Sequence, residues 1–206
     1  MTQFNELLDK AIRLKKEEQF EQALEILEDL FKKNPQSEII IKHLIDVLFE
    51  YGGYLCDEWT LGYKKASECF KRIIELDPKH YRAWYNLGIA YFNLNQTEEA
   101  LNAYNEALKI KSDYTYCYYN IGLIYEVHKN NLQKALEYYE KALSYNKNFS
   151  YAFQARRIIQ QKLDILKKNN LIETETSGQN KKICKICGNT CRIDAVFCDK
   201  CGKELE

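Results

Sequence analysis

Apolar residues between positions 81 and 114 recur at the spacing of two amphipathic helices. The first helix carries its apolar stripe at Trp84, Leu87, Gly88 and Tyr91. The second carries its stripe at Ala100, Leu101, Tyr104, Ala107 and Leu108. The polar residues between the two stripes predict a tight turn. A glycine inside a helix costs roughly 1 kcal/mol relative to alanine, so Gly88 indicates a close contact between the two helices.

The same pattern recurs along the chain, which predicts a repeat. Residues 115–149 carry the first-helix stripe again, at Tyr118, Ile121, Gly122 and Tyr125. An earlier segment matches the second-helix half, at Ala66, Phe70, Ile73 and Pro78. Near the start of the chain both halves are matched more loosely, at Ala11, Ala23, Leu27, Leu30 and Pro35. The pattern therefore predicts four repeats of about 34 residues, each a pair of helices. We place them at residues 4–37, 38–80, 81–114 and 115–149.

The period, and the phrase built on Trp84, Gly88 and Tyr91, are similar to the tetratricopeptide repeat family. The resemblance covers residues 4–149 and is strongest in the last two repeats. In the first two it rests on alanines, apolar spacing and closing prolines, without the tryptophan or the glycine. The resemblance implies an all-α fold, a right-handed solenoid of stacked helix hairpins whose first helices line a concave surface.

The second repeat is longer than its neighbours by about nine residues. We predict a helix from Glu38 to about Tyr51, with its buried stripe at Ile41, Leu44, Ile45 and Leu48. The excess, Gly52 to Thr60, is predicted to form an insertion in the turn. Insertions in helical arrays map to loops that often belong to a binding face. Alternatively, Trp59 folds back onto the edge of the repeat.

The C-terminal quarter of the chain divides into three parts. Residues 150–168 are predicted to form a helix that covers the last repeat, since terminal elements of a solenoid shield its end. The solenoid then spans residues 2–168. Residues 169–182 lack apolar periodicity and are rich in Thr, Ser, Gly and Asn, which predicts a flexible linker. Residues 183–206 form a separate small module.

That module contains two C-x2-C-G pairs, at Cys184, Cys187, Cys198 and Cys201. Two-residue spacing lets a tight turn aim both thiolates at one ion, and four thiolates suit tetrahedral zinc. The segment is similar to short zinc ribbons, whose aromatic position holds Phe197 here. We predict one structural Zn²⁺, because four sulfurs leave no open position for catalysis. Cys191 either replaces Cys187 or is a free thiol, and an iron–sulfur or redox centre is the other interpretation of the cluster.

The resemblance to the repeat family places a peptide-binding surface on the first helices. The residues there that lie off the packing stripes are Lys42, Arg82, Tyr85, Asn86, Ile89, Phe92, Tyr116, Tyr119, Asn120 and Leu123. In the family, asparagines at the places of Asn86 and Asn120 commonly hold the backbone of an extended peptide, and the resemblance implies that role. Alternatively, they satisfy neighbouring helix groups or water. Tyr116 and Asn120 stand where a clamp for a C-terminal carboxylate needs basic side chains, so we do not expect that clamp.

Composition narrows the possible functions. The 30 basic and 30 acidic side chains balance, so the chain lacks the basic excess of nucleic-acid-binding proteins. No phosphate-cradling loop, zinc-protease motif or serine-nucleophile motif occurs, and we expect no enzyme activity. The start, MTQFNELLDK, has no signal-peptide pattern, and no apolar run approaches the roughly 18 residues of a membrane span. We therefore expect a cytoplasmic protein.

We predict an interaction scaffold that binds a peptide or helix of a protein partner in the concave groove, with the zinc ribbon as a second contact. The alternative is a nucleic-acid-associated factor in which the ribbon contacts RNA or DNA. The ribbon residues that would make this contact are Lys181, Lys182, Lys185, Arg192, Lys200 and Lys203. The sequence leaves the oligomeric state open.

Overall fold

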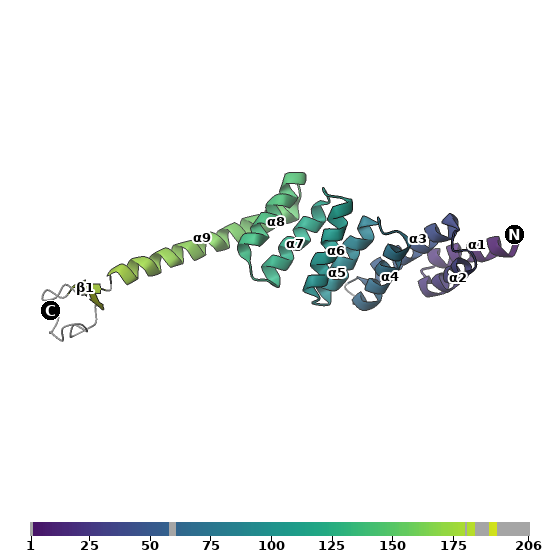
Figure 1. The fold of residues 1–206 in the computed structure, drawn as a ribbon, viewed down its shortest axis with the longest axis horizontal. Helices are drawn as coiled ribbons and strands as arrows, with labels where there is room; N and C mark the ends of the chain where they lie inside the picture. The colour runs from purple at the N-terminus through teal and green to yellow at the C-terminus, as the bar shows by residue number, and fades with distance from the viewer. Residues whose placement is uncertain (1, 58–60, 180, 184–189, 193–206) are drawn as a thin grey trace. The chain divides into compact units, whose positions relative to one another are not determined.

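The computed structural model describes the backbone of residues 2–57, 61–179, 181–183 and 190–192, and the side chains of residues 3–57 and 61–167. The chain divides into two units, Met1–Gln154 and Ala155–Glu206, which we describe separately. The first unit is a row of helices in which each helix packs against the next (Figure 1). Its helices are α1 (Thr2–Lys16), α2 (Phe20–Lys33), α3 (Glu38–Leu55), α4 (Tyr63–Leu76), α5 (Tyr81–Asn93), α6 (Thr97–Ile110), α7 (Thr115–Val127) and α8 (Leu132–Tyr145).

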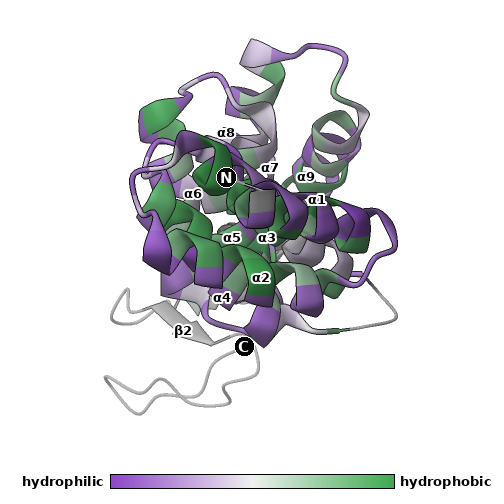
Figure 2. Ribbon diagram, turned by 90° about the vertical axis from the view of Figure 1, so that its right-hand side faces the viewer, coloured by the Kyte–Doolittle hydropathy of each residue, from purple (hydrophilic) through white to green (hydrophobic). Residues whose placement is uncertain are grey.

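These helices pair into four hairpins, α1–α2, α3–α4, α5–α6 and α7–α8, so the predicted array of helix hairpins is confirmed. The visible helices mix hydrophobic and hydrophilic residues, as amphipathic helices do (Figure 2). Among the described residues, each hairpin turn contains a residue in the left-handed backbone region: Glu18, Leu61, Asn95 and Asn130, with φ between 46° and 59°. Asparagine adopts this conformation readily, which explains its use in the last two turns.

The close helix contact that Gly88 indicated is present. A Cβ atom built on Gly88 would lie 2.5 Å from Cε1 of Tyr104, and one built on Gly122 would lie 2.5 Å from Cε1 of Tyr139. Both tyrosine side chains are buried, at 1% and 0% exposure, so neither ring has room to move aside. In each hairpin, the ring of the second helix therefore rests directly on the backbone of the first.

The second repeat contains the same contact, although the sequence placed its glycine in a loop. Gly52 lies within α3, and a Cβ atom there would lie 2.8 Å from the buried ring of Phe70. The expectation that this repeat lacks the glycine was wrong. The α3 helix has 18 residues where α5 has 13, so five of the excess residues lengthen the helix and only the others lengthen the turn. Trp59 lies outside the described residues.

The buried stripe of α3 also differs from the prediction. Leu44 and Leu48 are buried as expected, but Ile41 and Ile45 are only half-buried. Ile40 and Val47 take their places, at 0% and 1% exposure. The buried residues Ile40, Leu44, Val47, Leu48 and Tyr51 still follow helical spacing, so the buried face is rotated about the helix axis from the predicted one, toward the packing of α3 on α2 and α4.

The last described helix, α9 (Ser150–Gln179), is longer than expected. The first unit ends at Gln154 rather than at residue 168, and residues 169–179, which we assigned to a flexible linker, are helical. Leucine, isoleucine and glutamate in that segment sustain a helix, and Gly178 comes only at its end. At the start of α9, Phe149 and Ala152 are buried with Ala142 of α8.

Two short strands follow, β1 (Lys181–Ile183) and β2 (Thr190–Arg192). They pair antiparallel, with Lys181 opposite Arg192, Lys182 opposite Cys191 and Ile183 opposite Thr190. The predicted zinc ligands lie outside the described residues.

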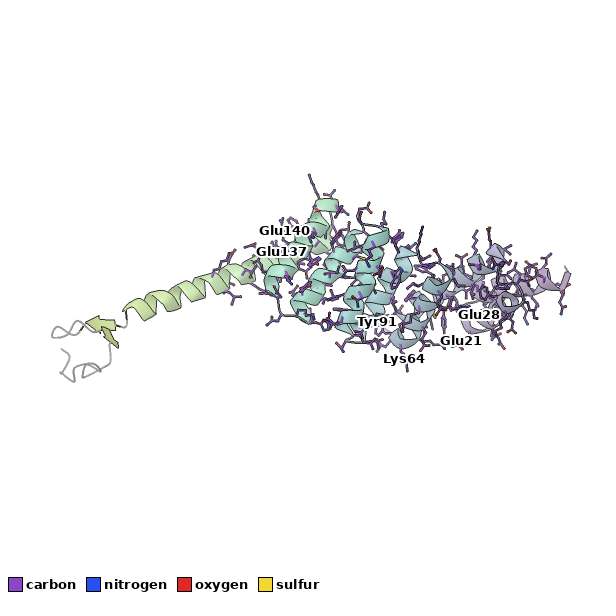
Figure 3. The ribbon with its side chains drawn as sticks, viewed as in Figure 1. Glu21, Glu28, Lys64, Tyr91, Glu137 and Glu140 are labelled. Atoms are coloured by element: carbon purple, nitrogen blue, oxygen red, sulfur yellow. The ribbon has the colours of Figure 1, made fainter. Side chains whose placement is uncertain are left out.

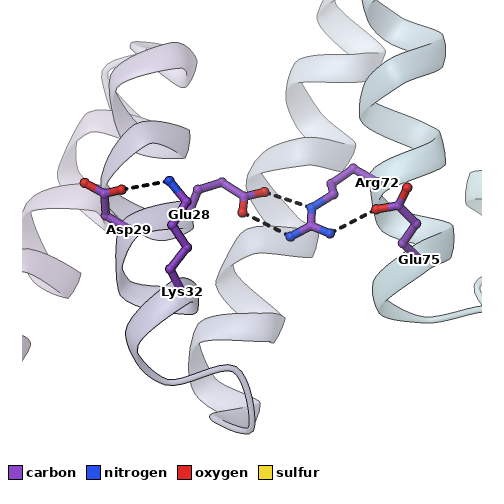
Figure 4. Close-up of polar contacts among 5 residues, drawn as sticks. All are labelled: Glu28, Asp29, Lys32, Arg72 and Glu75. Carbon is purple, nitrogen blue, oxygen red and sulfur yellow. Dashed lines mark hydrogen bonds and ion pairs between the residues drawn. The ribbon is translucent and has the colours of Figure 1, made fainter.

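A partly buried ion pair links neighbouring hairpins. The Nε and Nη2 atoms of Arg72 on α4 donate to the two carboxylate oxygens of Glu28 on α2, at 2.9 and 3.0 Å (Figure 4). Its Nη1 donates to Glu75 at 2.9 Å, and the adjacent Lys32 pairs with Asp29 at 3.2 Å. Two-pronged arginine–carboxylate pairs fix orientation as well as adding attraction, so this pair holds the first hairpin in register with the second.

Substituting Gly88 with alanine should destabilise the first unit by about 1–3 kcal/mol, because the new methyl group overlaps the buried ring of Tyr104. The matched control is Gly53→Ala, one residue beyond Gly52 in α3. A Cβ atom there meets nothing within 4 Å, so the better helix propensity of alanine should stabilise by about 0.5–1 kcal/mol. The free energy of unfolding of both variants is measured by urea denaturation, with helicity as the signal. Equal stabilities for the two variants would contradict the packing argument.

Candidate functional site

The exposed side chains differ between the first and second helices of the hairpins. The second helices display charged residues such as Glu21, Lys64, Glu137 and Glu140 (Figure 3). On the first helices α5 and α7, half-buried and exposed aromatic residues predominate instead. Tyr91 of α5 is half-buried as well, but it packs against the hydrophobic core, and the Lys71 ammonium lies 5.4 Å from the centre of its ring. The candidate site is therefore the surface of α5 and α7.

A cavity of about 210 Å³ opens between these two helices. It is lined by Tyr85, Ile89 and Phe92 of α5, by Asn120 and Leu123 of α7, and by Tyr104 of α6. The first five residues belong to the predicted groove, and the structure brings them together. Tyr104 is the addition that the sequence reasoning assigned to packing alone.

A polar cluster lies within the otherwise apolar lining. The Nδ2 of Asn120 donates to the hydroxyl oxygens of Tyr85 and Tyr104, at 3.4 and 3.3 Å. The amide nitrogen that the resemblance assigned to a peptide backbone is thus engaged inside the protein, which supports the alternative that we left open for Asn120. The asparagine fixes two hydroxyls that come from different helices.

Burial raises the pKa of these two hydroxyls. Removal from water is the largest cause that raises the pKa of Tyr85 and of Tyr104 well above the usual value. The nearby hydroxyl of Tyr114 raises the pKa of Tyr85 further, and the hydroxyl of Tyr85 does the same for Tyr104. The hydrogen bond from Asn120 opposes this shift. Burial also raises the pKa of Tyr114 to about 12. A tyrosine is protonated at neutral pH in any case, so the raised pKa values of Tyr85 and Tyr104 extend to alkaline pH the range in which each hydroxyl can donate one hydrogen bond.

Beside the cavity, aromatic rings form a continuous series from α5 to the start of α9. We call this series the aromatic ladder; its members are Tyr81, Tyr85, Tyr114, Tyr116, Phe149, Tyr119 and Tyr151. Neighbouring ring centroids lie 5.0 to 6.2 Å apart. Tyr116 and Tyr151 are 47% and 63% exposed, so the ladder offers rings to a partner.

The remaining predicted groove residues lie apart from the cavity. Arg82 is exposed, and its guanidinium lies 5.0 Å from the centre of the Phe49 ring, which links it to α3. Lys42 is exposed on α3 and Asn86 is half-buried on α5. The structure therefore concentrates the site on α5 and α7 rather than spreading it evenly over the first helices.

The sequence reasoning missed five residues of the cavity and ladder: Tyr81, Tyr104, Tyr114, Phe149 and Tyr151. A signal for two of them was available. Tyr114 and Phe149 each stand immediately before a first helix or its equivalent, one repeat apart. An aromatic residue at the same place in consecutive repeats lies on the same face of the array, next to the residues that we did predict.

The described cysteines do not form a reactive site. Cys69 and Cys117 are buried, and burial raises the pKa of their thiols to about 11 and about 12. Burial likewise raises the pKa of the half-buried Cys56 to about 11. A thiol that stays protonated is a poor nucleophile, as expected for packing residues. Among the described residues, no group of three or more His, Cys, Asp or Glu side chains is placed to hold a metal ion.

Comparison with known proteins agrees with this fold. The hairpins and their aromatic first-helix surface define a helical-repeat solenoid of the kind that presents a ligand groove. Residues 81–114 and residues 115–149 each match a model of the tetratricopeptide repeat. The hairpins α5–α6 and α7–α8 therefore match the tetratricopeptide repeat, and the row of hairpins shares the fold of solved structures built from helix hairpins.

Among curated proteins, anaphase-promoting complex subunit 3 of Schizosaccharomyces pombe is 31% identical over 90 residues, which are 44% of this chain and 13% of that protein. The crystal structure of MamA superposes with a TM-score of 0.59 at 23% identity, covering 82% of this chain and 96% of that one. The first repeat domain of Spaghetti (RPAP3), bound to the HSP90 peptide SRMEEVD, gives a TM-score of 0.52 at 27% identity, over 58% and 93% of the two chains.

This chain spans only 10% to 20% of the length of the curated relatives that it matches. The similarity to them is therefore a similarity of repeats. In the part of the chain that the structure describes, no helix combines the length and the apolar character needed to cross a membrane.

The buried tyrosine hydroxyls should lose their protons at a higher pH than exposed tyrosines do. Because their folded pKa values lie above the value of about 10 for an unfolded tyrosine, the stability they provide is complete below about pH 10. It is lost as the pH rises toward the folded values. Tyrosinate absorbance against pH should show one group of phenols ionising early and a second group ionising only with loss of helicity. Tyr104→Phe should reduce the second group by one. A single early step with helicity retained would contradict the assignment.

Proposed function

We propose that this chain is an interaction scaffold that binds a peptide segment of a protein partner on the surface of α5 and α7. The observation that carries the proposal is the cavity between these helices, which shares Tyr85 with the aromatic ladder, whose rings Tyr116 and Tyr151 are exposed. The RPAP3 repeat domain, similar in fold, is bound to an HSP90 peptide, which supports a peptide as the ligand class. We infer that the scaffold acts without catalysis and in the cytoplasm.

The chemistry of the surface favours an apolar anchor. Filling the cavity with one large side chain contributes about 1.5–3 kcal/mol, and tyrosine walls add contact area at low entropic cost. Tyr116 and Asn120 replace the basic side chains of a carboxylate clamp. We therefore propose that this scaffold holds its partner through an internal segment instead of a terminal carboxylate.

For the C-terminal module we propose one structural Zn²⁺ held by Cys184, Cys187, Cys198 and Cys201. The pairing of β1 with β2 supports it, because Ile183 lies opposite Thr190 and these two residues flank the first C-x2-C-G pair in the sequence. Two-residue spacing of cysteines is the spacing of a zinc knuckle. Zinc would stabilise this module. Because the module is linked to the solenoid, we propose that it makes a second contact with the same partner. Contact with nucleic acid through the ribbon lysines stays the alternative prediction.

Selection of short random peptides on the immobilised full chain tests the groove. Leu123→Asp, which places a charge in the cavity wall, should weaken the selected peptides by about 10–100-fold, since it removes an apolar contact worth about 1.5–3 kcal/mol. Ile110→Asp makes the same change at an exposed aliphatic residue at the end of α6 and should leave affinity unchanged. Circular dichroism verifies that both variants keep their helices. Equal affinities for the two variants would remove the cavity from the binding site.

The zinc proposal predicts one zinc per purified full chain by elemental analysis. Cys198→Ser should lose most of the metal, because three thiolates bind zinc less tightly than four. Cys191→Ser should keep the metal, because the proposal assigns zinc to the four other cysteines. Cobalt substitution should give the visible absorption of tetrahedral thiolate coordination. A chain purified without zinc, and unable to take up cobalt, would refute the site.

A further inference from the structure

We propose that α9 binds the surface of a membrane that contains anionic lipids, with the helix lying in the plane of the interface. This inference goes beyond the proposed function, because it concerns residues 155–167 of the second unit and not the surface of α5 and α7. It is carried by the distribution of apolar residues around this part of the helix and by the charges beside them.

Apolar residues occupy one side of α9 between residues 155 and 167. At 3.6 residues per turn, the apolar side chains of this stretch lie within an arc of roughly 160°; they are Ala155, Ile158, Ile159, Leu163, Ile165 and Leu166. Ile159 is buried, at 0% exposure, whereas Ile158, Ile165 and Leu166 are 46%, 57% and 50% exposed. This part of α9 is therefore an amphipathic helix that presents three large aliphatic side chains to solvent.

The same stretch is basic, although the chain as a whole has no net charge. Residues 155–167 contain one acidic side chain, Asp164, and four basic ones, which are Arg156, Arg157, Lys162 and Lys167. Around the helix axis, Lys162 lies about 40° from Ile158 on one side, and Arg157 lies about 80° from Ile165 on the other. Asp164 accepts a hydrogen bond from the neutral amide of Gln160, at 3.0 Å. The exposed aliphatic residues are thus bordered by cations, in a segment of net positive charge.

A basic amphipathic helix fits two kinds of surface, an anionic membrane or an acidic groove on a protein, and the position of Lys162 favours the membrane. Around the helix axis Lys162 lies between Ile158 and Leu166, about 40° from each. A protein groove that enclosed both aliphatic side chains would have to take the ammonium out of water, which is costly. At a membrane surface, the long side chain reaches the phosphate groups while its stem stays beside the lipid chains.

The same residue disfavours a second copy of the chain as the occupant. Two α9 helices paired through Ile158 and Ile165 would enclose the ammonium of Lys162 from both copies, and a lysine inside such a seam weakens it. The cations that border the aliphatic residues would also face their own counterparts or lie close to them. Anionic lipids offer the opposite charge instead.

The amount of exposed apolar surface indicates that charge must contribute to binding. Membrane binding by an interfacial helix depends on apolar burial together with attraction to anionic lipids. Residues 155–167 expose three aliphatic side chains, each already about half covered, so burial alone would hold the chain weakly. The four cations supply the remaining attraction. We therefore expect binding that requires anionic lipid and weakens as salt is added.

Co-sedimentation of the full chain with lipid vesicles tests the electrostatic part. Vesicles of phosphatidylcholine with phosphatidylserine should bind the chain at least tenfold more tightly than phosphatidylcholine alone. Arg157→Gln combined with Lys167→Gln should weaken binding about 20–30-fold, since each cation near an anionic surface contributes about fivefold, or about 1 kcal/mol. Lys33→Gln combined with Lys64→Gln makes the same change of net charge at exposed lysines of α2 and α4. This control should bind the vesicles as the unmodified chain does.

The apolar part is tested in the same assay. Ile158→Gln combined with Ile165→Gln should weaken binding to the anionic vesicles at least tenfold, because the aliphatic contact with lipid is lost. Both side chains are exposed, so circular dichroism should show unchanged helicity without lipid. Ile39→Gln combined with Ile110→Gln makes the same change at exposed isoleucines of α3 and α6 and should leave vesicle binding unchanged.

Four results would overturn the inference. The first is the absence of binding to phosphatidylserine vesicles at low salt. The second is binding that both α9 variants retain, since the lipid contact would then lie elsewhere in the chain. The third is an equal loss of binding in the lysine control, which would make net charge the cause. The fourth is a dimer in solution that the α9 isoleucine substitutions abolish, without any vesicle binding, which would identify a second α9 as the occupant.

Discussion

The contact between a glycine backbone and an aromatic ring sets the geometry of this solenoid. In three successive hairpins a ring of the second helix lies against a glycine of the first, at Gly52, Gly88 and Gly122. Any side chain at these positions would push the helices apart, so the contact fixes their spacing. Interiors are closely packed and side chains have few alternative positions. Successive hairpins therefore keep the same distance between their two helices.

The same contact builds the candidate site. The Tyr104 ring rests on Gly88, and its hydroxyl accepts a hydrogen bond from Asn120 of the following repeat. One residue therefore closes its own hairpin and also forms part of the cavity shared with its neighbour. Tyr139 repeats the arrangement on Gly122, but its hydroxyl donates to Glu126 instead. The tyrosine hydroxyl thus has an amide partner in one repeat and a carboxylate partner in the next, so adjacent repeats with the same backbone arrangement have different surfaces.

Much of the fold could be predicted from the sequence, because repeated spacing reports burial on a helix. The hairpins and the close approaches at Gly88 and Gly122 followed from that spacing. Gly52 could not be recognised, because the lengthened α3 moves it out of register with the other repeats. The segment from residue 169 to Gln179 was misjudged because weak apolar periodicity does not prevent a helix when no proline interrupts it.

The site was predictable in part for a related reason. Spacing identifies which residues lie on the face of a first helix, and Tyr85, Ile89, Phe92, Asn120 and Leu123 met in one cavity. Spacing within one helix does not reveal contributions from another element. Tyr104 reaches the cavity from α6, and Phe149 reaches the ladder from the residue before α9. Asn120 donates hydrogen bonds to Tyr85 of α5 and Tyr104 of α6, so its partners were visible only in three dimensions.

The arrangement in which each helix packs against the next has a consequence for how the first unit comes apart. Opening of the α1–α2 hairpin removes contacts from α3 and, through Arg72, from α4, but leaves α5 to α8 paired. Stability in such an array is a sum of local pairings, so fraying from the N-terminal end spares the aromatic surface. Binding of a ligand on the aromatic surface therefore does not depend on an intact first repeat. Substitutions can accumulate in the first repeat without loss of the binding surface.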